Sequence, residues 1–483
     1  DFYYTPPTGY KALNTDNLDD PSIVLPTEHF NTVLYAGNGG TQSVTGAGFS
    51  PNFVWIKNRT DAVNHGLFDT IRGVKNSVIS NANTEARTAA GATEDLYAFG
   101  TDGFSVGVGG GAYINCNESS KNYASWNWKG SDTPSKTFAV TVTNPGSGNR
   151  YTLDGKVSGT NAMPITIEEG GTYTFDQSDN SNSGHPLRFS TTANGTHGGG
   201  SEYTTGVTVS GTPGSAGAKT VITVAASAAT LYFYCTAHSG MGAQASTPGS
   251  GGGVSDLSGT IASVVNANTT AGFSIATYTG NGTSPSTIGH GLSVAPEMVM
   301  VKNRTTNAEN WVVSIGNITG TNGDFLILNT TSAVVTGTSQ FPSQPGSSTF
   351  AVTDAANVNT NTSNYIAYCF HSVDGYSKVG GYTGNGSTDG TFVYTGFRPA
   401  FIIWKSTSAT ENWQIQDNKM NPFNVVDGKI FANTTAAEFT GAEVDFVSNG
   451  FKLRHSGGGG NGSGETLIYL AFAESPLKYA NAR

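Results

Sequence analysis

Two segments about fifty residues apart hold side chains that can bind a metal ion. The second segment places Cys235, His238 and Met241 on one short loop after an aromatic run, with the spacing C-x2-H-x2-M. His185, in the first segment, would supply a second imidazole. A thiolate and two imidazoles in a trigonal plane, with a more distant thioether, suit copper, because this geometry is a compromise between its two oxidation states. The pattern therefore predicts a copper site.

The loop after Tyr234 resembles the ligand loop of the small blue-copper proteins, the cupredoxins, in its short form. Residues 165–175 (ITIEEGGTYTF) also resemble the strand–turn–strand that precedes the first cupredoxin histidine. The resemblance implies a cupredoxin-like Greek-key sandwich over residues 138–247. Carried over residue by residue, it implies as ligands His185, Cys235, His238 and the axial Met241. Pro186 departs from the family pattern, because many cupredoxins have an asparagine there that ties the two ligand loops together.

Other residues of the same types are interpreted as structural. A cupredoxin-like sandwich that uses no metal is the alternative, with Cys235 as a small buried apolar side chain and His238 as a hydrogen-bonded loop residue. His197 lies in a glycine-rich loop and is interpreted as a solvent-facing or turn residue, not a fifth ligand. Cys116 and Cys369 have no neighbouring histidine or cysteine and are interpreted as structural thiols.

On either side of this segment, one sequence pattern occurs three times in the chain. Each copy opens with the pattern Tyr-x-Gly-Asn-Gly, which starts at Tyr35, Tyr278 and Tyr382. Each copy then has a proline and an apolar run ending in lysine, at residues 51–57, 296–302 and 399–405. Each closes on an alternating strand that ends at Trp128, Phe370 and Phe472. The spans from opening tyrosine to closing aromatic are 93, 92 and 90 residues, so we interpret these segments as three copies of one domain.

The closing strands predict which side chains share a face. With a period of two, one face of these strands carries Ala124, Trp126 and Trp128, then Ile366, Tyr368 and Phe370, then Ile468, Leu470 and Phe472. We expect this face to form the core of each sandwich. The opposite face carries smaller residues, such as Ser125, Ala367 and Ala471, which suit packing under a second layer.

Two tryptophans occupy equivalent positions in the second and third copies. Trp311 and Trp413 each follow an asparagine, where the first copy has His65 after Asn64. An exposed tryptophan there could stack on sugar rings. A position in a core or between domains is favoured, because six tryptophans among four sandwiches is ordinary.

Composition predicts an all-β, multidomain chain of β-sandwiches. The three repeats are expected to be jelly-roll-like, and the resemblance implies the cupredoxin-like guest. Only 12% of the 483 residues are charged, glycine accounts for 64, and short runs rich in Val, Ile, Thr, Tyr and Phe are separated by turn residues. The predicted boundaries are an exit strand and tether of an upstream domain (1–29), repeat one (30–130), the guest (138–247), a linker (248–272), repeat two (273–375) and repeat three (376–483).

Several classes of function are disfavoured by the sequence. The net charge is −10 without a basic patch, which argues against nucleic-acid binding. No apolar run is long enough to span a bilayer. No pair of carboxylates recurs in all three copies, so we expect no enzyme activity. Three cysteines exclude a disulfide framework, and the chain starts without a methionine, which suggests a processed or longer protein.

The repeats, together with residues 2–15 (FYYTPPTGYKALNT), resemble virion structural proteins of marine tailed bacteriophages, notably those of cyanophages and pelagiphages. The resemblance implies a tail fibre, spike or other appendage that assembles in the host cytoplasm and is extracellular in the mature particle. It also implies a homotrimer, other virion proteins as partners, and host-surface glycan as a further partner.

Three functions are therefore weighed. The leading hypothesis is a non-enzymatic virion appendage, a rod of β-sandwiches with an inserted copper module and a role in host attachment. The second is a copper-binding electron-transfer protein on a repeat scaffold, which would need an apolar patch beside the exposed histidine. The third is a glycan-binding or glycan-cleaving spike, which would need a groove of aromatic side chains and acids, and the sequence shows no such acids.

Overall fold

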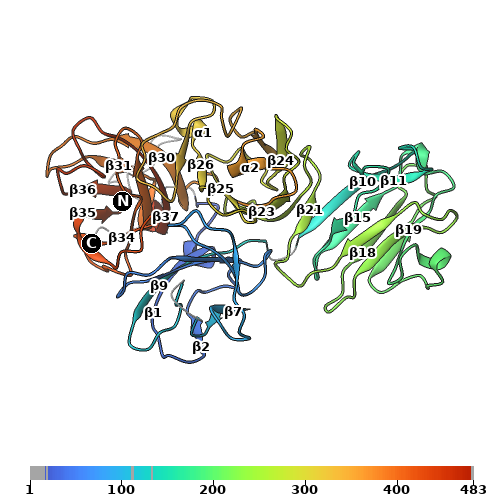
Figure 1. The fold of residues 1–483 in the computed structure, drawn as a ribbon, viewed down its shortest axis with the longest axis horizontal. Coiled ribbons are helices and arrows are strands. Elements are labelled where there is room, and N and C mark those ends of the chain that lie inside the picture. Colours follow the sequence, from blue (N-terminus) through green and yellow to red (C-terminus); the bar gives the residue numbers. More distant parts are fainter. Residues whose placement is uncertain (1–16, 18–19, 110–113, 132–133, 480–483) are drawn as a thin grey trace, which may run out of the picture.

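The computed structural model describes residues 17, 20–109, 114–131 and 134–479. The three repeats lie together in one body, and the guest domain forms a second lobe at its side (Figure 1). The fold is all-β, as composition predicts, and its α-helices in the described part are two of four residues each, α1 (Gly316–Thr319) and α2 (Ala356–Asn359). No helix among the described residues is long and apolar enough to cross a membrane. The opening motif at 2–15 lies outside the described residues.

The first repeat is a sandwich of two sheets. Its larger sheet has the order β1-β9-β3-β4-β5-β6 and its smaller sheet the order β2-β8-β7. The strands are β1 (Phe30–Ala36), β2 (Gln42–Thr45), β3 (Phe53–Asn58), β4 (Gly66–Asp69), β5 (Asn76–Val78), β6 (Arg87–Thr88), β7 (Leu96–Gly100), β8 (Gly103–Val106) and β9 (Asn122–Trp128).

The second repeat has a larger sheet in the order β21-β22-β23-β29-β25-β26-β27 and the pair β24-β28. Its strands are β21 (Val254–Asp256), β22 (Ser263–Asn268), β23 (Phe273–Thr279), β24 (Ser286–Gly289), β25 (Met298–Asn303), β26 (Val312–Ser314), β27 (Phe325–Ile327), β28 (Thr349–Val352) and β29 (Asn364–Phe370).

The third repeat is one curled sheet in the order β30-β37-β32-β33-β34-β35-β36-β31. Its strands are β30 (Ser377–Thr383), β31 (Phe392–Tyr394), β32 (Phe397–Ser406), β33 (Gln414–Asp417), β34 (Val426–Phe431), β35 (Phe439–Val447), β36 (Gly450–Leu453) and β37 (Thr466–Pro476). Five strands recur in one order, as β1-β9-β3-β4-β5, β23-β29-β25-β26-β27 and β30-β37-β32-β33-β34. The shared topology predicted from the motif spacing is confirmed.

The aromatic faces of the closing strands meet in one core that all three repeats share. This common core contains Trp126 and Trp128 of the first repeat, Tyr368 of the second and Phe472 of the third, all nearly fully buried. Trp128 packs against Phe472, with ring centroids 5.7 Å apart. The opposite faces pack inward, with Ala471 in the separate core of the third repeat. The prediction that the aromatic face is each sandwich's own core is therefore wrong, because the bulkiest surface is buried between repeats.

A ring of equivalent hydrogen bonds joins each repeat to the next. His65 of the first repeat lies 3.1 Å, through Nε2, from the carbonyl oxygen of Phe431 in the third. Trp413 of the third donates to the carbonyl of Ile327 in the second at 3.0 Å. The ring closes on the first repeat, where the carbonyl of Ile79 accepts from Trp311 at 2.8 Å.

This ring decides two expectations from the sequence. Trp311 and Trp413 are fully buried, so the inter-domain position favoured for them is confirmed. The expected rod is wrong for the repeats, because each one contacts both of the others around the common core.

The guest domain is a sandwich of a five-stranded sheet, β11-β10-β15-β18-β17, and a four-stranded sheet, β14-β20-β19-β16, with the small hairpin β12-β13. Its strands are β10 (Ser135–Thr143), β11 (Arg150–Leu153), β12 (Val157–Ser158), β13 (Asn161–Ala162), β14 (Ile165–Thr166), β15 (Thr172–Asp176), β16 (Leu187–Ser190), β17 (Val207–Ser210), β18 (Lys219–Thr223), β19 (Leu231–Cys235) and β20 (Ala243–Ser246). The β10–β15 and β14–β20 pairs are parallel, so the chain crosses between the sheets.

Described parts of the segments expected to be a tether and a linker, residues 20–29 and 248–272, pack in the body. The linker predicted at 248–272 is wrong in its second half, because β22 pairs with β23 along its whole length. Its glycine run is also fixed, since Gly253 donates to the buried Glu168 of the guest. Near the N-terminus, Ile23 is 3% exposed in the common core, and Asp20 forms an ion pair with Lys478.

Candidate metal centre

Antiparallel pairing of β16 and β19 brings the first histidine to the cysteine. Cys235 is the last residue of β19, and its register partner is Leu187, the first residue of β16. His185 precedes Leu187 by two residues, so it lies at the same end of the sheet as Cys235. His238 follows in the loop between β19 and β20. The strand pairing therefore places all three residues at one pole of the guest sandwich.

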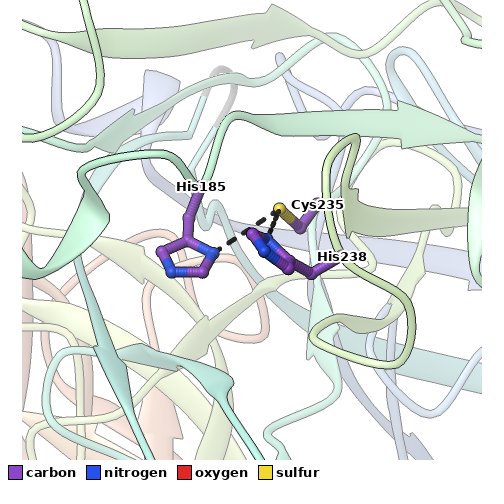
Figure 2. Close-up of side chains that lie close together, drawn as sticks. All are labelled: His185, Cys235 and His238. Carbon is purple, nitrogen blue, oxygen red and sulfur yellow. Dashed lines mark hydrogen bonds between the residues drawn. The ribbon is translucent and has the colours of Figure 1, made fainter.

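The three side chains converge in the structure. Figure 2 shows both imidazole rings directed toward the Cys235 sulfur. Sγ lies 3.8 Å from Nδ1 of His185 and 3.8 Å from Nδ1 of His238. The two imidazole centroids are 4.6 Å apart, and one ligand atom from each residue lies within 4.8 Å of the others. The same nitrogen of each ring faces the thiol, so the arrangement is symmetric about the sulfur.

These separations fit one metal ion bound by the three side chains. Metal–thiolate and metal–imidazole bonds of about 2.3 and about 2.0 Å that meet at about 120° put sulfur and nitrogen about 3.7 Å apart. The observed separations of 3.8 Å match this value. A soft thiolate with two imidazoles is also a donor set that copper and zinc accept. The three residues therefore fit the copper ion that the sequence predicts.

Burial differs among the three ligands. Cys235 is fully buried at the end of its strand, whereas His185 is half-buried and His238 is exposed. Burial lowers the pKa of His185 below its ordinary value of 6.5, and the neighbouring His238 lowers it further. A lowered pKa keeps the imidazole neutral near pH 7, which is the form that binds a metal.

Met241, the expected axial ligand, lies at the far end of the same loop. It is 1% exposed and packs in the core cluster that also contains Cys235 and Tyr151. Its carbonyl accepts a hydrogen bond from the Tyr151 amide at 2.9 Å. The thioether is therefore buried, and its role as a ligand stays a prediction.

A network of hydrogen bonds fixes the first histidine. The carbonyl oxygen of His185 accepts from the Tyr151 hydroxyl at 2.7 Å and from Nε2 of Gln177 at 2.9 Å. Gln177 also accepts from the Leu187 amide through Oε1 at 3.1 Å. Because Gln177 is 1% exposed, these bonds are shielded from water and hold the backbone of His185 rigidly.

A residue that sequence reasoning missed ties down the second ligand loop. Asn194 donates from Nδ2 to the Ser239 hydroxyl at 2.8 Å and accepts from the Gly240 amide through Oδ1 at 2.8 Å. Both contacts are to the two residues that follow His238. Asn194 therefore connects the loop of His238 to a neighbouring loop. Its φ of +62° is a backbone conformation that asparagine adopts more readily than most residues.

His197 also has a contact that the sequence did not indicate. Its Nε2 lies 3.1 Å from the carbonyl oxygen of Cys235. It is exposed, as a solvent-facing residue should be, and lies outside the three-residue cluster. The other two thiols, Cys116 and Cys369, are fully buried and unbridged, and burial raises the pKa of each, as structural thiols require.

Neither the curated proteins nor the solved structures include a match to this chain. A family described as Domain of unknown function (DUF7483) matches residues 25–152 and 246–476. The match thus spans the three repeats and leaves out 153–245, which hold the three converging side chains. Because the matched segments make up most of the chain, the protein belongs to the DUF7483 family.

Proposed function

We propose that this chain is a non-enzymatic structural protein of a phage virion appendage, and that its guest domain is a type 1 copper-like module. The observation that carries the copper proposal is the convergence of Cys235 Sγ and two imidazole Nδ1 atoms at 3.8 Å. The appendage proposal is supported by the sequence resemblance and by the single core that the three repeats share.

The chain's own residues prepare the site for a metal. Gln177 and Tyr151 hold His185, while Asn194 holds the loop of His238. The buried position of Cys235 excludes water from the sulfur. Bound copper would supply one-electron redox chemistry at this pole. Because the thiol must lose its proton to bind, metal affinity should fall as the pH is lowered and the ligands take up protons.

Copper(II) added to the full purified chain tests the module. We expect an intense blue thiolate-to-copper absorption and a narrow copper hyperfine splitting in electron paramagnetic resonance. Cys235→Ser should abolish the colour, and Met241→Leu should change the reduction potential more than the affinity. Cys116→Ser, at a buried thiol of the first repeat, is the matched control and should stay blue. A wild-type chain that stays colourless with copper would leave a guest domain with a structural role.

The electron-transfer alternative is less well supported. A redox shuttle needs an apolar docking patch around its exposed ligand. Residues 236–240 around His238 are threonine, alanine, histidine, serine and glycine. Of the guest domain's described residues, the large apolar side chain that is clearly exposed is Val209, in β17 of the other sheet. A stable module on a structural protein therefore accounts for these features better than a shuttle.

Self-association into a homotrimer belongs to the same proposal. Repetitive appendage proteins usually form closed symmetric assemblies. A mass measurement on the purified chain decides it. A stable monomer would mean that the three repeats of one chain supply all the threefold character, and the homotrimer would then be wrong.

A further inference from the structure

The third repeat departs from the other two on the strand that follows the Tyr-x-Gly-Asn-Gly turn. This strand is β2, β24 or β31, and its central residue points inward as Val44, Ile288 or Val393. The two flanking positions hold the exposed Ser43 and Thr45 in the first repeat, the half-buried Thr287 and buried Gly289 in the second, and Phe392 and Tyr394 in the third. Phe392 is 45% exposed and Tyr394 is 60% exposed. Two large aromatic side chains thus face solvent where the sister repeats have small residues.

A second departure lies on the opening strand of the same repeat. β30 carries Gly380 and Gly381, where the equivalent strands carry Val33 and Leu34 or Ala276 and Thr277. Adjacent glycines inside a strand weaken it, and often mark a place where another group approaches the backbone. A Cβ added at Gly380 would lie 2.9 Å from the Tyr469 hydroxyl, and one at Gly381 would lie 3.1 Å from the Leu467 carbonyl oxygen. Because successive strand residues face opposite sides, Tyr469 covers the side of Gly380, whereas Gly381 is exposed and carries no side chain there.

Both departures line one groove. β30 and β31 are the two end strands of the curled sheet, so the groove is the open seam of the third repeat. Its volume is about 480 Å³, within the range of small-molecule sites. The second repeat closes one side of the groove with Glu297, Asn317 and Ile318. Two independent changes from the repeat pattern therefore meet at the same place.

The polar groups of the groove are held in position. Glu297 accepts from the Ser372 amide at 2.7 Å, and Asn317 donates to the Pro296 carbonyl at 2.8 Å. Phe392 lies over Gly450 of the neighbouring strand, because a Cβ there would meet its ring at 3.1 Å. Lys378 adds an ammonium group to the lining. A ligand would thus meet a largely prearranged surface, which reduces the entropy lost on binding.

We propose that this groove binds a carbohydrate chain. A pyranose ring has an apolar C–H face, which stacks on an exposed aromatic ring, and a rim of hydroxyl groups. The exposed ring of Tyr394 supplies the stacking surface. The fixed carboxylate of Glu297 accepts hydrogen bonds from hydroxyl groups, whereas Lys378 donates them. The exposed Gly381 lets a flat ring approach the strand closely. An apolar peptide would leave these polar groups without partners, so a glycan fits the lining better.

The test is binding of the full-length protein to an array of neutral, uronic-acid and sulfated oligosaccharides and polysaccharides. Calorimetry then measures the affinity for the carbohydrate that binds. The double variant Phe392→Ser/Tyr394→Thr restores the first repeat's residues at exposed positions of a strand, so it should fold normally. We expect it to bind the glycan at least roughly ten-fold more weakly.

Phe423→Ser is the matched control. It removes another exposed aromatic side chain of the third repeat, 72% exposed and outside the groove, and should leave glycan affinity unchanged. Absence of binding to any arrayed glycan overturns the proposal, as does binding that the double variant retains. Because the groove and the copper site share no residue, either can fail while the other stands.

Discussion

At the scale of single residues, the side chains that hold the ligands in place are as informative as the ligands. Asn194 makes two hydrogen bonds to the loop that carries His238, one to Ser239 and one to Gly240. Residues 236–240 of this loop are exposed, so few apolar contacts hold the loop in place. The orientation of His238 therefore depends on Asn194.

Asn194→Gly tests this dependence. Glycine accepts the positive φ, so the variant removes the side-chain bonds without backbone strain. We expect unfolding of the guest domain to cost about 1 kcal/mol less, with a faster loss of copper to a chelator and a shifted reduction potential. Thermal unfolding, stopped-flow chelation and voltammetry measure these effects. Asn194→Asp keeps the acceptor for Gly240 and should give an intermediate result, and unchanged copper kinetics in Asn194→Gly would contradict the role.

The sequence could predict donors but not their supports. The C-x2-H-x2-M spacing fixes donor types on one loop, and a sandwich returns His185 to the same pole, so three converging residues were predictable. Asn194 was not, because its partners are a backbone amide and a serine hydroxyl more than forty residues away. Such bonds follow from the path of two loops, which no residue pattern shows.

At the scale of secondary-structure elements, the ring of inter-repeat hydrogen bonds explains why three similar sandwiches form one body. Trp311, Trp413 and His65 stand at equivalent positions, and each bonds a carbonyl on the edge of another repeat. His65 accepts from the Trp55 indole through Nδ1, so its Nε2 carries the proton and donates. The histidine is therefore neutral, and its Nε2–H donates the inter-repeat hydrogen bond that the indole N–H donates in the other two copies.

Trp311→Phe removes one bond of this ring. The Ile79 carbonyl would be left buried without its partner, which costs about 1–3 kcal/mol, and the smaller ring adds a packing loss. Denaturant unfolding should show a lower midpoint for the whole body in one transition, since the repeats share a core. Trp404→Phe is the comparison, because that indole bonds Gly459 within the third repeat. An early, separate transition of one repeat in Trp311→Phe would show that the repeats unfold independently.

The alternation of large and small side chains along the closing strands was predictable. The core in which the aromatic face lies was not. A period of two separates Trp126 and Trp128 from Ser125, and the structure keeps that separation. Either face could have been the interior of a single sandwich. The larger face lies in the common core because three copies together can bury more aromatic surface than one sandwich encloses. This outcome depends on how the repeats associate, and the sequence of one copy does not show that association.

At the scale of the whole molecule, the body contains three equivalent buried lysines, one at the end of each apolar run. Lys57, Lys302 and Lys405 are fully buried. Each donates to backbone carbonyls, and Lys57 and Lys302 reach across to another repeat, at Thr435 and Asn83. Burial lowers the pKa of each from its ordinary value of 10.5 to about 8, against a smaller opposing effect of nearby acids.

These lysines predict an unusual dependence of stability on pH. Between pH 8 and pH 10.5 the unfolded chain keeps protons on them that the folded chain has released, so the free energy of unfolding rises with pH across this window. Above about pH 10 buried tyrosines act in the opposite direction, because burial raises their pKa and the unfolded chain loses those protons first. Melting temperature should therefore increase from pH 8 and pass through a maximum at about pH 10.

The variant Lys57→Met/Lys302→Met/Lys405→Met should be less stable at about pH 10, since it leaves backbone carbonyls unpaired, and its melting temperature should no longer rise from pH 8. A wild-type melting temperature that is flat or falls between pH 8 and pH 10 would show that the three lysines stay protonated in the folded chain.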